Sequence, residues 1–545
     1  MSSVGNNRKI LIVEYAGVLA GFLLMYLFIL PQMDVFLLSR YVDDTLRGAV
    51  NFSLYYGNGR LLGNIIGVYF SNHFVFATII ISVVLTAIVF LLNSILLDNS
   101  PYTVFLFALF IAFPSIRFLQ EVYYAFACVA NYVIPMVFLL ASVYVCTQTV
   151  KTNIIRFRRQ KTILFLVGSL SAAASCLFSE NTTILAVVIA IAMVVYFYLG
   201  KQTGDPSYLW IQLAAIAAGT AVMFLIPIIT KTSGNLSGYR QITTELTELI
   251  RNVLFSYFLF ADIFNHLLLL LIVFSFAMIL LLCKQKRKVP YLTNLQLGIF
   301  VAYPLLCFCL NQTDSNTPLS YVTMLKLADA ALTTLYAANV IITVFLVEDK
   351  VLRLQCILMS VVVVMSVAPM MVVTASGERT YYTTFVAMTV FAVILIRQLL
   401  PEGFAKIMKT SEFRKMTTGI SAGCFAMLSA VLLLLGLYNY DFYVIRCGDM
   451  AETITVGRQQ GVDIVQKEPV LPFSPSSMES HSDKVLFLAF DENSRIDTET
   501  IALTAWDHYD YYRNEIVKNP FEALRFAFEN WEYKDPKYPD SLILK

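Results

Sequence analysis

Charge is scarce in this sequence: Asp, Glu, Lys and Arg make up 14% of the 545 residues, against about 25% in typical soluble domains. The net charge is only +2, and with no basic tract the sequence gives no sign of a nucleic-acid partner. None of the nine cysteines forms a C-x-x-C pair and the four histidines are scattered, which argues against zinc and thioredoxin-type sites. The sequence also lacks a G-x-G-x-x-G motif and a phosphate loop.

Apolar residues, by contrast, are abundant, at 58% of the chain. They fall into blocks of about 18–22 residues, the length that crosses a hydrocarbon core about 30 Å thick. The first block, Ile10–Leu30, is too long for a signal peptide and lacks a small-residue cleavage site, so we predict that it is a transmembrane helix. The fold class predicted is an all-α polytopic membrane protein with about thirteen transmembrane helices. The predicted spans are 10–30, 74–94, 101–116, 132–149, 162–178, 182–199, 208–229, 262–283, 292–310, 328–347, 354–374, 381–399 and 419–438.

The distribution of Lys and Arg predicts the orientation. With the N-terminus in the cytoplasm, the inner segments carry about twice as many basic residues as the outer loops, as the positive-inside rule requires. The Arg156–Lys161 and Lys284–Lys288 segments are then cytoplasmic. We predict a multi-pass protein of the cell (plasma or inner) membrane, with an extracytoplasmic C-terminus.

The chain changes character after the last predicted span. Residues 439–545 are polar and aromatic and contain the proline-rich run PVLPFSPSS, and about 100 residues suffice for one small domain. We predict a transmembrane domain over 1–438 and a small extracytoplasmic C-terminal domain, α/β or mixed, over 439–545. Within it, apolar residues at helical spacing predict an amphipathic helix at 519–533.

Unusual polar residues gather in the predicted outer loops. The stretch YVDDTLRGAVNFSLYYGNGRLLGN, residues 41–64, pairs two carboxylates with Arg47 and Arg60, which favours a functional site over a solvated loop. For the turn Ser179–Thr182 a simple helix cap remains an equal alternative, and for Gln120–Glu121 a structural role is favoured. Glu14, in the first span, is interpreted as a paired or snorkelling group rather than a proton relay. The candidate site residues are Asp43, Asp44, Asn58, Arg60, Glu121, Asn131, Glu180, Asn181 and Arg379.

A family resemblance rests on these motifs. The DD pair, the NGR leading into an apolar segment and the Glu–Asn turn resemble a group of uncharacterised bacterial multipass proteins that looks related to the GT-C glycosyltransferases, which use polyprenyl-phosphate sugars. Asn131–Tyr132, Arg379 and the run WDHYDYY at Trp506–Tyr512 fit the same group. The Trp that precedes the Asn–Tyr pair in that group is missing from AFACVANY. The resemblance implies a GT-C-like core with a catalytic acidic residue in the first outer loop.

Chemistry leads to the same class of donor. No inner segment is long enough to bind a nucleotide sugar, so a sugar transferred outside must arrive on a lipid phosphate. We expect Asp43 to be the general base and Asp44 to orient it, bind acceptor or hold a divalent cation, with any metal requirement undetermined. Arg60 or Arg379 is expected to bind phosphate and Glu180 the acceptor, a surface polysaccharide or other glycan. The remaining candidates are assigned to substrate binding, and stacking on sugar faces is an alternative to an interfacial aromatic belt for Tyr55, Tyr56, Tyr123 and Tyr124.

Three other functions fit the sequence less well. A polysaccharide polymerase or ligase would depend on arginines and large outer loops more than on a DD pair. A transporter of lipid-linked glycans would typically show repeats and deep charges, and we found no repeat. A non-catalytic scaffold would use the C-terminal region as an interaction module.

Overall fold

The protein is an all-α membrane protein. The computed structural model describes residues 2–28, 45–56, 60–119, 122–123, 126–151, 158–202, 205–230, 246–284, 290–310, 319–367, 378–401, 410–460 and 520–529. Within these ranges ten helices are long and apolar enough to cross a membrane. Two shorter apolar helices, Lys161–Ser175 and Leu268–Lys284, and a nine-residue helix, Val104–Ala112, occupy the other three predicted spans. The prediction of a multipass helical membrane protein is confirmed.

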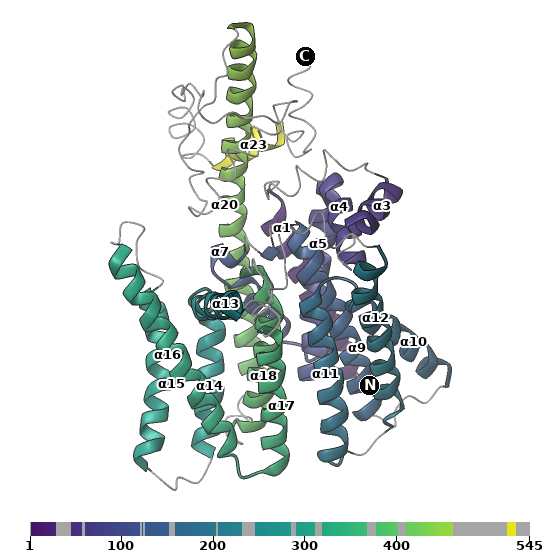
Figure 1. Cartoon of the computed structure of the whole chain (residues 1–545), viewed down its shortest axis with the longest axis vertical. Helices are drawn as coiled ribbons and strands as arrows, with labels where there is room; N and C mark the ends of the chain where they lie inside the picture. Colours follow the sequence, from purple (N-terminus) through teal and green to yellow (C-terminus); the bar gives the residue numbers. More distant parts are fainter. Residues whose placement is uncertain are drawn as a thin grey trace.

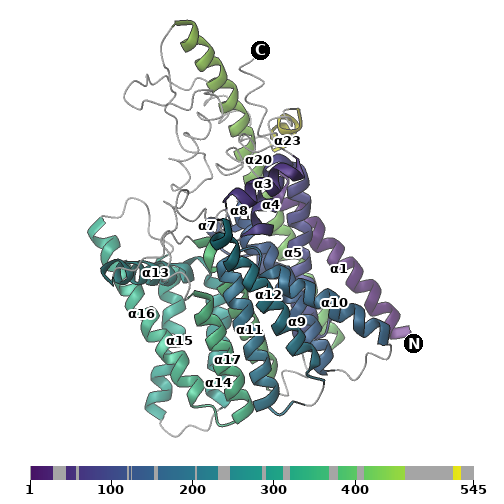
Figure 2. The same ribbon diagram turned by 45° about the vertical axis from the view of Figure 1, so that its right-hand side comes forward.

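The long helices run roughly side by side as a bundle (Figure 1 and Figure 2). Such helices satisfy their own backbone hydrogen bonds, which is what a lipid environment demands. Their bounds are α1 Ser2–Tyr26, α5 Phe74–Leu97, α6 Val104–Ala112, α9 Ile134–Lys151, α10 Arg158–Ser175, α11 Glu180–Leu199, α12 Ser207–Thr230, α14 Leu268–Lys284, α15 Pro290–Leu310, α16 Leu319–Phe345, α17 Lys350–Val367, α18 Tyr382–Leu399 and α20 Ser411–Gln460.

Aromatic contacts join segments that are distant in sequence. Phe22 of α1 meets Phe425 of α20 edge to face, with ring centroids 5.4 Å apart. Phe274 of α14 meets Phe391 of α18 in the same way at 5.4 Å. Such pairs contribute about 0.5–1.5 kcal/mol beyond their buried area. They fix the neighbours of α1, α14, α18 and α20 more specifically than leucine packing alone would.

The stretch 41–64, predicted to be an outer loop, contains helices from residue 46 onward. Helix α3, Leu46–Tyr56, and helix α4, Leu61–Asn72, form a short hairpin at one end of the bundle (Figure 2). Thr45 caps α3 by accepting the N–H of Gly48 at 3.0 Å, and the Ser53 hydroxyl donates to the Leu61 carbonyl at 3.0 Å. At 11 and 12 residues, both helices are too short to span a membrane.

A further helix lies across the bundle. Helix α13, Leu246–His266, runs at a steep angle to its neighbours at the same end as α3 and α4 (Figure 2). Leu246, Ile250 and Leu254, one turn apart on its surface, are exposed. An apolar stripe on a helix in this orientation is typical of a helix in the membrane interface. The sequence analysis missed α13 because it searched for apolar blocks of spanning length.

At the opposite end, Glu14 anchors the turn between α5 and α6. Glu14 is 4% exposed, and its two carboxylate oxygens accept the Tyr102 N–H at 3.0 and 3.2 Å. Tyr102 has a φ of 76°, an uncommon backbone conformation for a non-glycine residue. Of the two roles predicted for Glu14, the structure shows pairing, and the partner is the backbone of this turn.

The predicted boundary at 438/439 falls inside a continuous helix. Helix α20 begins within the bundle at Ser411 and continues to Gln460, beyond the ends of its neighbours (Figure 1). Helix α23, Pro520–Glu529, confirms the helix predicted near 519–533. Phe28, at the end of α1, contacts Tyr440 of α20 and Phe528 of α23, with ring centroids 5.8 and 5.9 Å apart. The division into two domains and the fold of the second one stay predictions.

Candidate functional site

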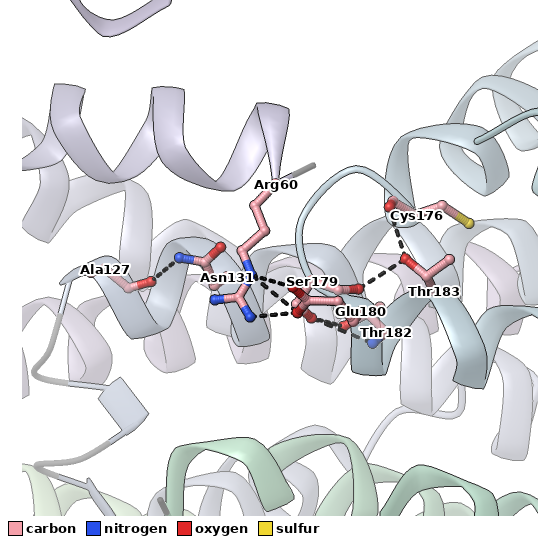
Figure 3. A network of polar contacts seen from close by, with 8 residues as sticks. All are labelled: Arg60, Ala127, Asn131, Cys176, Ser179, Glu180, Thr182 and Thr183. Carbon is pink, nitrogen blue, oxygen red and sulfur yellow. Dashed lines mark hydrogen bonds and ion pairs between the residues drawn. The ribbon is translucent and has the colours of Figure 1, made fainter. Parts of the chain in front are cut away.

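Two of the predicted site residues form an ion pair. Arg60, immediately before α4, and Glu180, the first residue of α11, are 120 positions apart in the chain. The Arg60 Nε lies 3.2 and 3.1 Å from the two Glu180 carboxylate oxygens, and Nη2 also donates to Oε2 (Figure 3). The side chains are only 11% and 32% exposed. A bidentate contact of this kind fixes the orientation of the guanidinium as well as its position.

The local sequence explains why Glu180 is placed here. Ser179 caps α11, with its hydroxyl accepting the Thr182 N–H at 3.4 Å and lying 2.9 Å from the Thr182 hydroxyl. The Thr183 hydroxyl donates to the Cys176 carbonyl at 2.8 Å. A carboxylate in the first turn of a helix also interacts favourably with the helix dipole. The capped turn is therefore present as the structural alternative predicted, and the same cap aims Glu180 at Arg60.

Helix α4 is seated on this turn through its backbone. The Leu62 N–H donates to the Leu177 carbonyl at 3.0 Å. A Cβ on Gly63 would lie 2.2 Å from Oδ1 of Asn131 and 3.0 Å from the Phe178 carbonyl oxygen. Only a glycine fits at position 63, because α4 passes so close to Asn131 and Phe178. This close packing places Arg60, at the start of α4, within reach of Glu180.

Asn131 lies in the π-helical segment η2, Val129–Val133. Its Nδ2 donates to the Ala127 carbonyl at 2.7 Å (Figure 3). Its Oδ1 is buried and has no hydrogen-bond partner among the residues that the structure describes. A π-helical turn is often found at functional sites, and Asn131 is thereby brought against α4 and the Ser179 turn. Asn181 is only 1% exposed, so it is part of the protein interior rather than of an open rim.

The other predicted residues are placed less completely. Asp43, Asp44, Asn58 and Glu121 lie outside the described residues. Arg379 belongs to the 3₁₀ turn η6, Glu378–Tyr381, of which only the backbone can be described at that position. The structure thus brings together Arg60, Asn131 and Glu180, with Asn181 beside Glu180 in α11. It does not test the assignment of the remaining residues.

Stacking on a sugar face is ruled out for Tyr123, for which a place in an interfacial aromatic belt was the alternative. Tyr123 is 0% exposed. Its hydroxyl donates to the Ile111 carbonyl at 3.3 Å, and its ring packs edge to face on Tyr382 at 5.6 Å. Tyr123 is therefore a core residue in contact with α6 and α18.

Asp441 is a buried acid that the sequence analysis missed. It lies in α20, three residues beyond the span that ends at Tyr438, and is 0% exposed. Neither carboxylate oxygen has a hydrogen-bond partner among the described residues. Burial raises the pKa of Asp441 to about 8, and such a carboxyl group in a folded protein is a functional-site candidate. It was missed because a domain boundary was placed two residues earlier in the chain.

No metal site is evident in the described part of the chain, where no cluster of three or more His, Cys, Asp or Glu residues occurs. Asp43 and Asp44 lie outside the described residues, so a divalent cation at the DD pair stays a prediction.

Comparison with known protein families, with characterised proteins and with solved structures gives no match for this chain.

Proposed function

We propose that this protein is an integral-membrane glycosyltransferase. It moves a sugar from a polyprenyl-phosphate donor to a cell-surface glycan on the extracytoplasmic side, with Asp43 as the base and Asp44 as its neighbour. The observation that carries the proposal is the Arg60–Glu180 ion pair. It joins two polar segments that the charge pattern assigns to the same side of the membrane, and it fixes the α3–α4 hairpin that directly follows the DD pair.

The hairpin gives Arg60 a more specific role. Helix α3 has 11 residues and is therefore about 16 Å long. Thr45, which follows Asp44, caps its start, and Tyr56 is its last residue. Arg60 follows the far end of this helix and is already engaged by Glu180. We therefore assign Arg60 and Glu180 to positioning the hairpin, and leave phosphate binding to Arg379 or to other outer-loop cations.

The reaction needs a base within hydrogen-bond reach of the acceptor hydroxyl and an in-line arrangement of acceptor, sugar and phosphate. In the sequence, Asp43 and Asp44 directly precede Thr45, the residue that caps α3. Transfer inverts the anomeric carbon: the acceptor oxygen forms the new bond, its proton passes to the carboxylate, and the lipid phosphate leaves.

The direct test is sugar transfer by the purified full chain with a polyprenyl-phosphate-sugar donor. Asp43→Asn keeps the size of the side chain and removes its ability to accept a proton. We expect transfer to fall by roughly 10²–10⁴-fold, with donor binding retained. Glu348→Gln, an exposed carboxylate between α16 and α17, is the matched control and should leave transfer unchanged. Near-normal transfer by both Asp43→Asn and Asp44→Asn would rule out the pair as catalytic.

One observation favours a transporter as the second candidate. Asp329 lies within the span Leu327–Phe345, is 4% exposed and accepts the Asn265 amide at 3.2 Å. A buried carboxylate within a membrane-spanning segment is a common element of substrate or ion pathways. Movement of lipid-linked glycan across proteoliposome membranes, lost in Asp329→Asn but unaffected by Asp43→Asn, would favour transport over transfer.

A further inference from the structure

A cavity of about 500 Å³ lies between α5, α9, α11, α17 and α18. Its walls extend from Met136 to Thr147 on α9 and from Val386 to Gln398 on α18. At the rise of an α-helix these stretches are about 16 and 18 Å long. One leaflet of a bilayer whose core is about 30 Å thick is about 15 Å deep, so the cavity walls are about as long as one leaflet is deep.

The polarity of the cavity wall is strongly one-sided. The end nearest the Arg60–Glu180 pair is lined by apolar side chains such as Met136, Leu185 and Val386. The uncharged polar and cationic side chains of the wall gather at the other end, near the ends of α9, α11 and α18 and the start of α17. They are Thr147, Tyr196, Gln202, Gln355, Arg397 and Gln398. A ligand that fits this wall has an apolar chain and a polar head at the membrane face opposite the candidate site.

Arg397 is the charged side chain among the described residues that line this mouth, and it favours an anionic head. Arg397 donates to the Leu96 carbonyl and lies 3.0 Å from Asp98, with the two side chains 48% and 57% exposed. Lys284, from α14, donates to the carbonyl of the adjacent Gln398 at 3.5 Å. Arg397 is thus paired with Asp98, Lys284 lies beside Gln398, and the Asp349 carboxylate acts on Tyr196 at the same mouth. Exposed ion pairs of this kind are weak, so a lipid phosphate can replace Asp98 as the partner of Arg397.

We propose that this cavity binds a glycerophospholipid with an anionic headgroup, from the leaflet opposite the candidate site. One acyl chain fills the apolar part, and the phosphate lies at Arg397. A polyprenyl-phosphate donor fits this cavity poorly, because its phosphate would have to enter at the face away from Arg60 and Glu180. The lipid site is thus separate from the proposed transfer site and does not depend on the reaction proposed for it.

The test is native mass spectrometry of the full chain in detergent, with phosphatidylglycerol, phosphatidylcholine or undecaprenyl phosphate added as the probe. We expect one retained phosphatidylglycerol, favoured over phosphatidylcholine by roughly fivefold, the effect of about one basic residue near an anionic lipid. Ala192→Trp, which fills the apolar part, should abolish retention. Ile191→Trp, one residue along the same helix and on its exposed side, is the matched control and should keep the lipid.

Two substitutions at the mouth test the headgroup contact without altering the apolar wall. Arg397→Gln should remove the preference for phosphatidylglycerol, and Asp98→Asn should strengthen it by releasing Arg397. These variants keep the proposal testable if Ala192→Trp does not fold. Equal retention in Ala192→Trp and Ile191→Trp, a preference unaffected by Arg397→Gln, or retention of undecaprenyl phosphate instead of phosphatidylglycerol would overturn the assignment.

Discussion

Arg60 and Glu180 each have a second reason to be where they are. Arg60 precedes the first turn of α4, which Gly63 allows to approach Asn131, and Glu180 begins α11 under a serine cap. Neither side chain is more than a third exposed, so the pair is not an ordinary surface contact. A charge left unpaired in such a place costs more than an exposed ion pair contributes.

A double-mutant cycle tests whether the two residues act as one unit. We expect Arg60→Gln and Glu180→Gln each to lower the free energy of unfolding by about 1–3 kcal/mol, because each leaves a partly buried charge without its partner. The double variant should be no worse than the poorer single variant. The measurement is denaturant or thermal unfolding in detergent, with sugar transfer measured beside it.

If the loss of sugar transfer in the double variant equalled the sum of the losses in Arg60→Gln and Glu180→Gln, the positioning role of the pair would be contradicted. They would mean that Arg60 and Glu180 contact different parts of the substrates, as the sequence first suggested. Glu348→Gln again provides the control, since it removes an exposed carboxylate.

At the scale of elements, α20 differs most from the expected organisation. It leaves the bundle near Tyr438 and continues as one helix to Gln460. Just past the membrane span, Tyr440 and Asp441 are both 0% exposed, and Tyr440 contacts Phe28 of α1. The Tyr440–Phe28 contact therefore joins α20 to the end of α1 just past the span.

The burial of Asp441 predicts a pH dependence with a definite sign. Its pKa is raised from 3.8 to about 8 in the folded protein, so between these values the folded state binds more protons than the unfolded state. Stability from this group is therefore fully present below about pH 4 and is lost as the pH rises toward 8. Asp441→Asn stays neutral and should lose less stability over that range than the unsubstituted protein.

Melting temperatures in detergent at several pH values measure this difference. The melting temperature of Asp441→Asn should exceed that of the unsubstituted protein by a growing margin as the pH rises from about 4 to about 8. Parallel curves would show that the Asp441 carboxyl is solvated or paired in the protein. The exposed Glu412 of the same helix offers a control, and Glu412→Gln should follow the unsubstituted curve.

At the scale of the whole molecule, the two ends of the helix bundle carry different ion pairs, and the orientation of the bundle in the membrane decides which end faces the cytoplasm. Arg60 and Glu180 are ion-paired at one end, while Lys161 and Asp205 lie 2.5 Å apart at the other end of α10 and α12. The excess of Lys and Arg in the segments at that second end predicts that it faces the cytoplasm. All proposed extracytoplasmic chemistry depends on this orientation.

Labelling of exposed residues in intact cells tests it. A cysteine at Thr45, beside the DD pair, should react with a membrane-impermeant thiol reagent, whereas one at Lys201 should react only after the cells are opened. Both positions are exposed, so reactivity should differ only through sidedness; the unsubstituted protein serves as the control for its own cysteines. Labelling of Lys201→Cys from outside would place the proposed site in the cytoplasm and remove the argument for a lipid-linked donor.

Sequence alone determined the class of this protein, because apolar blocks of spanning length have few alternatives to membrane helices. It also selected Arg60 and Glu180, since charge in short loops between such blocks is conspicuous. Only the tertiary structure decided that these two residues meet, that Tyr123 is buried, and that α3, α4 and α13 are helices. Those outcomes depend on contacts between residues far apart in the chain. Hydropathy reports the partition of each segment between lipid and water, but it carries no information about which helices become neighbours.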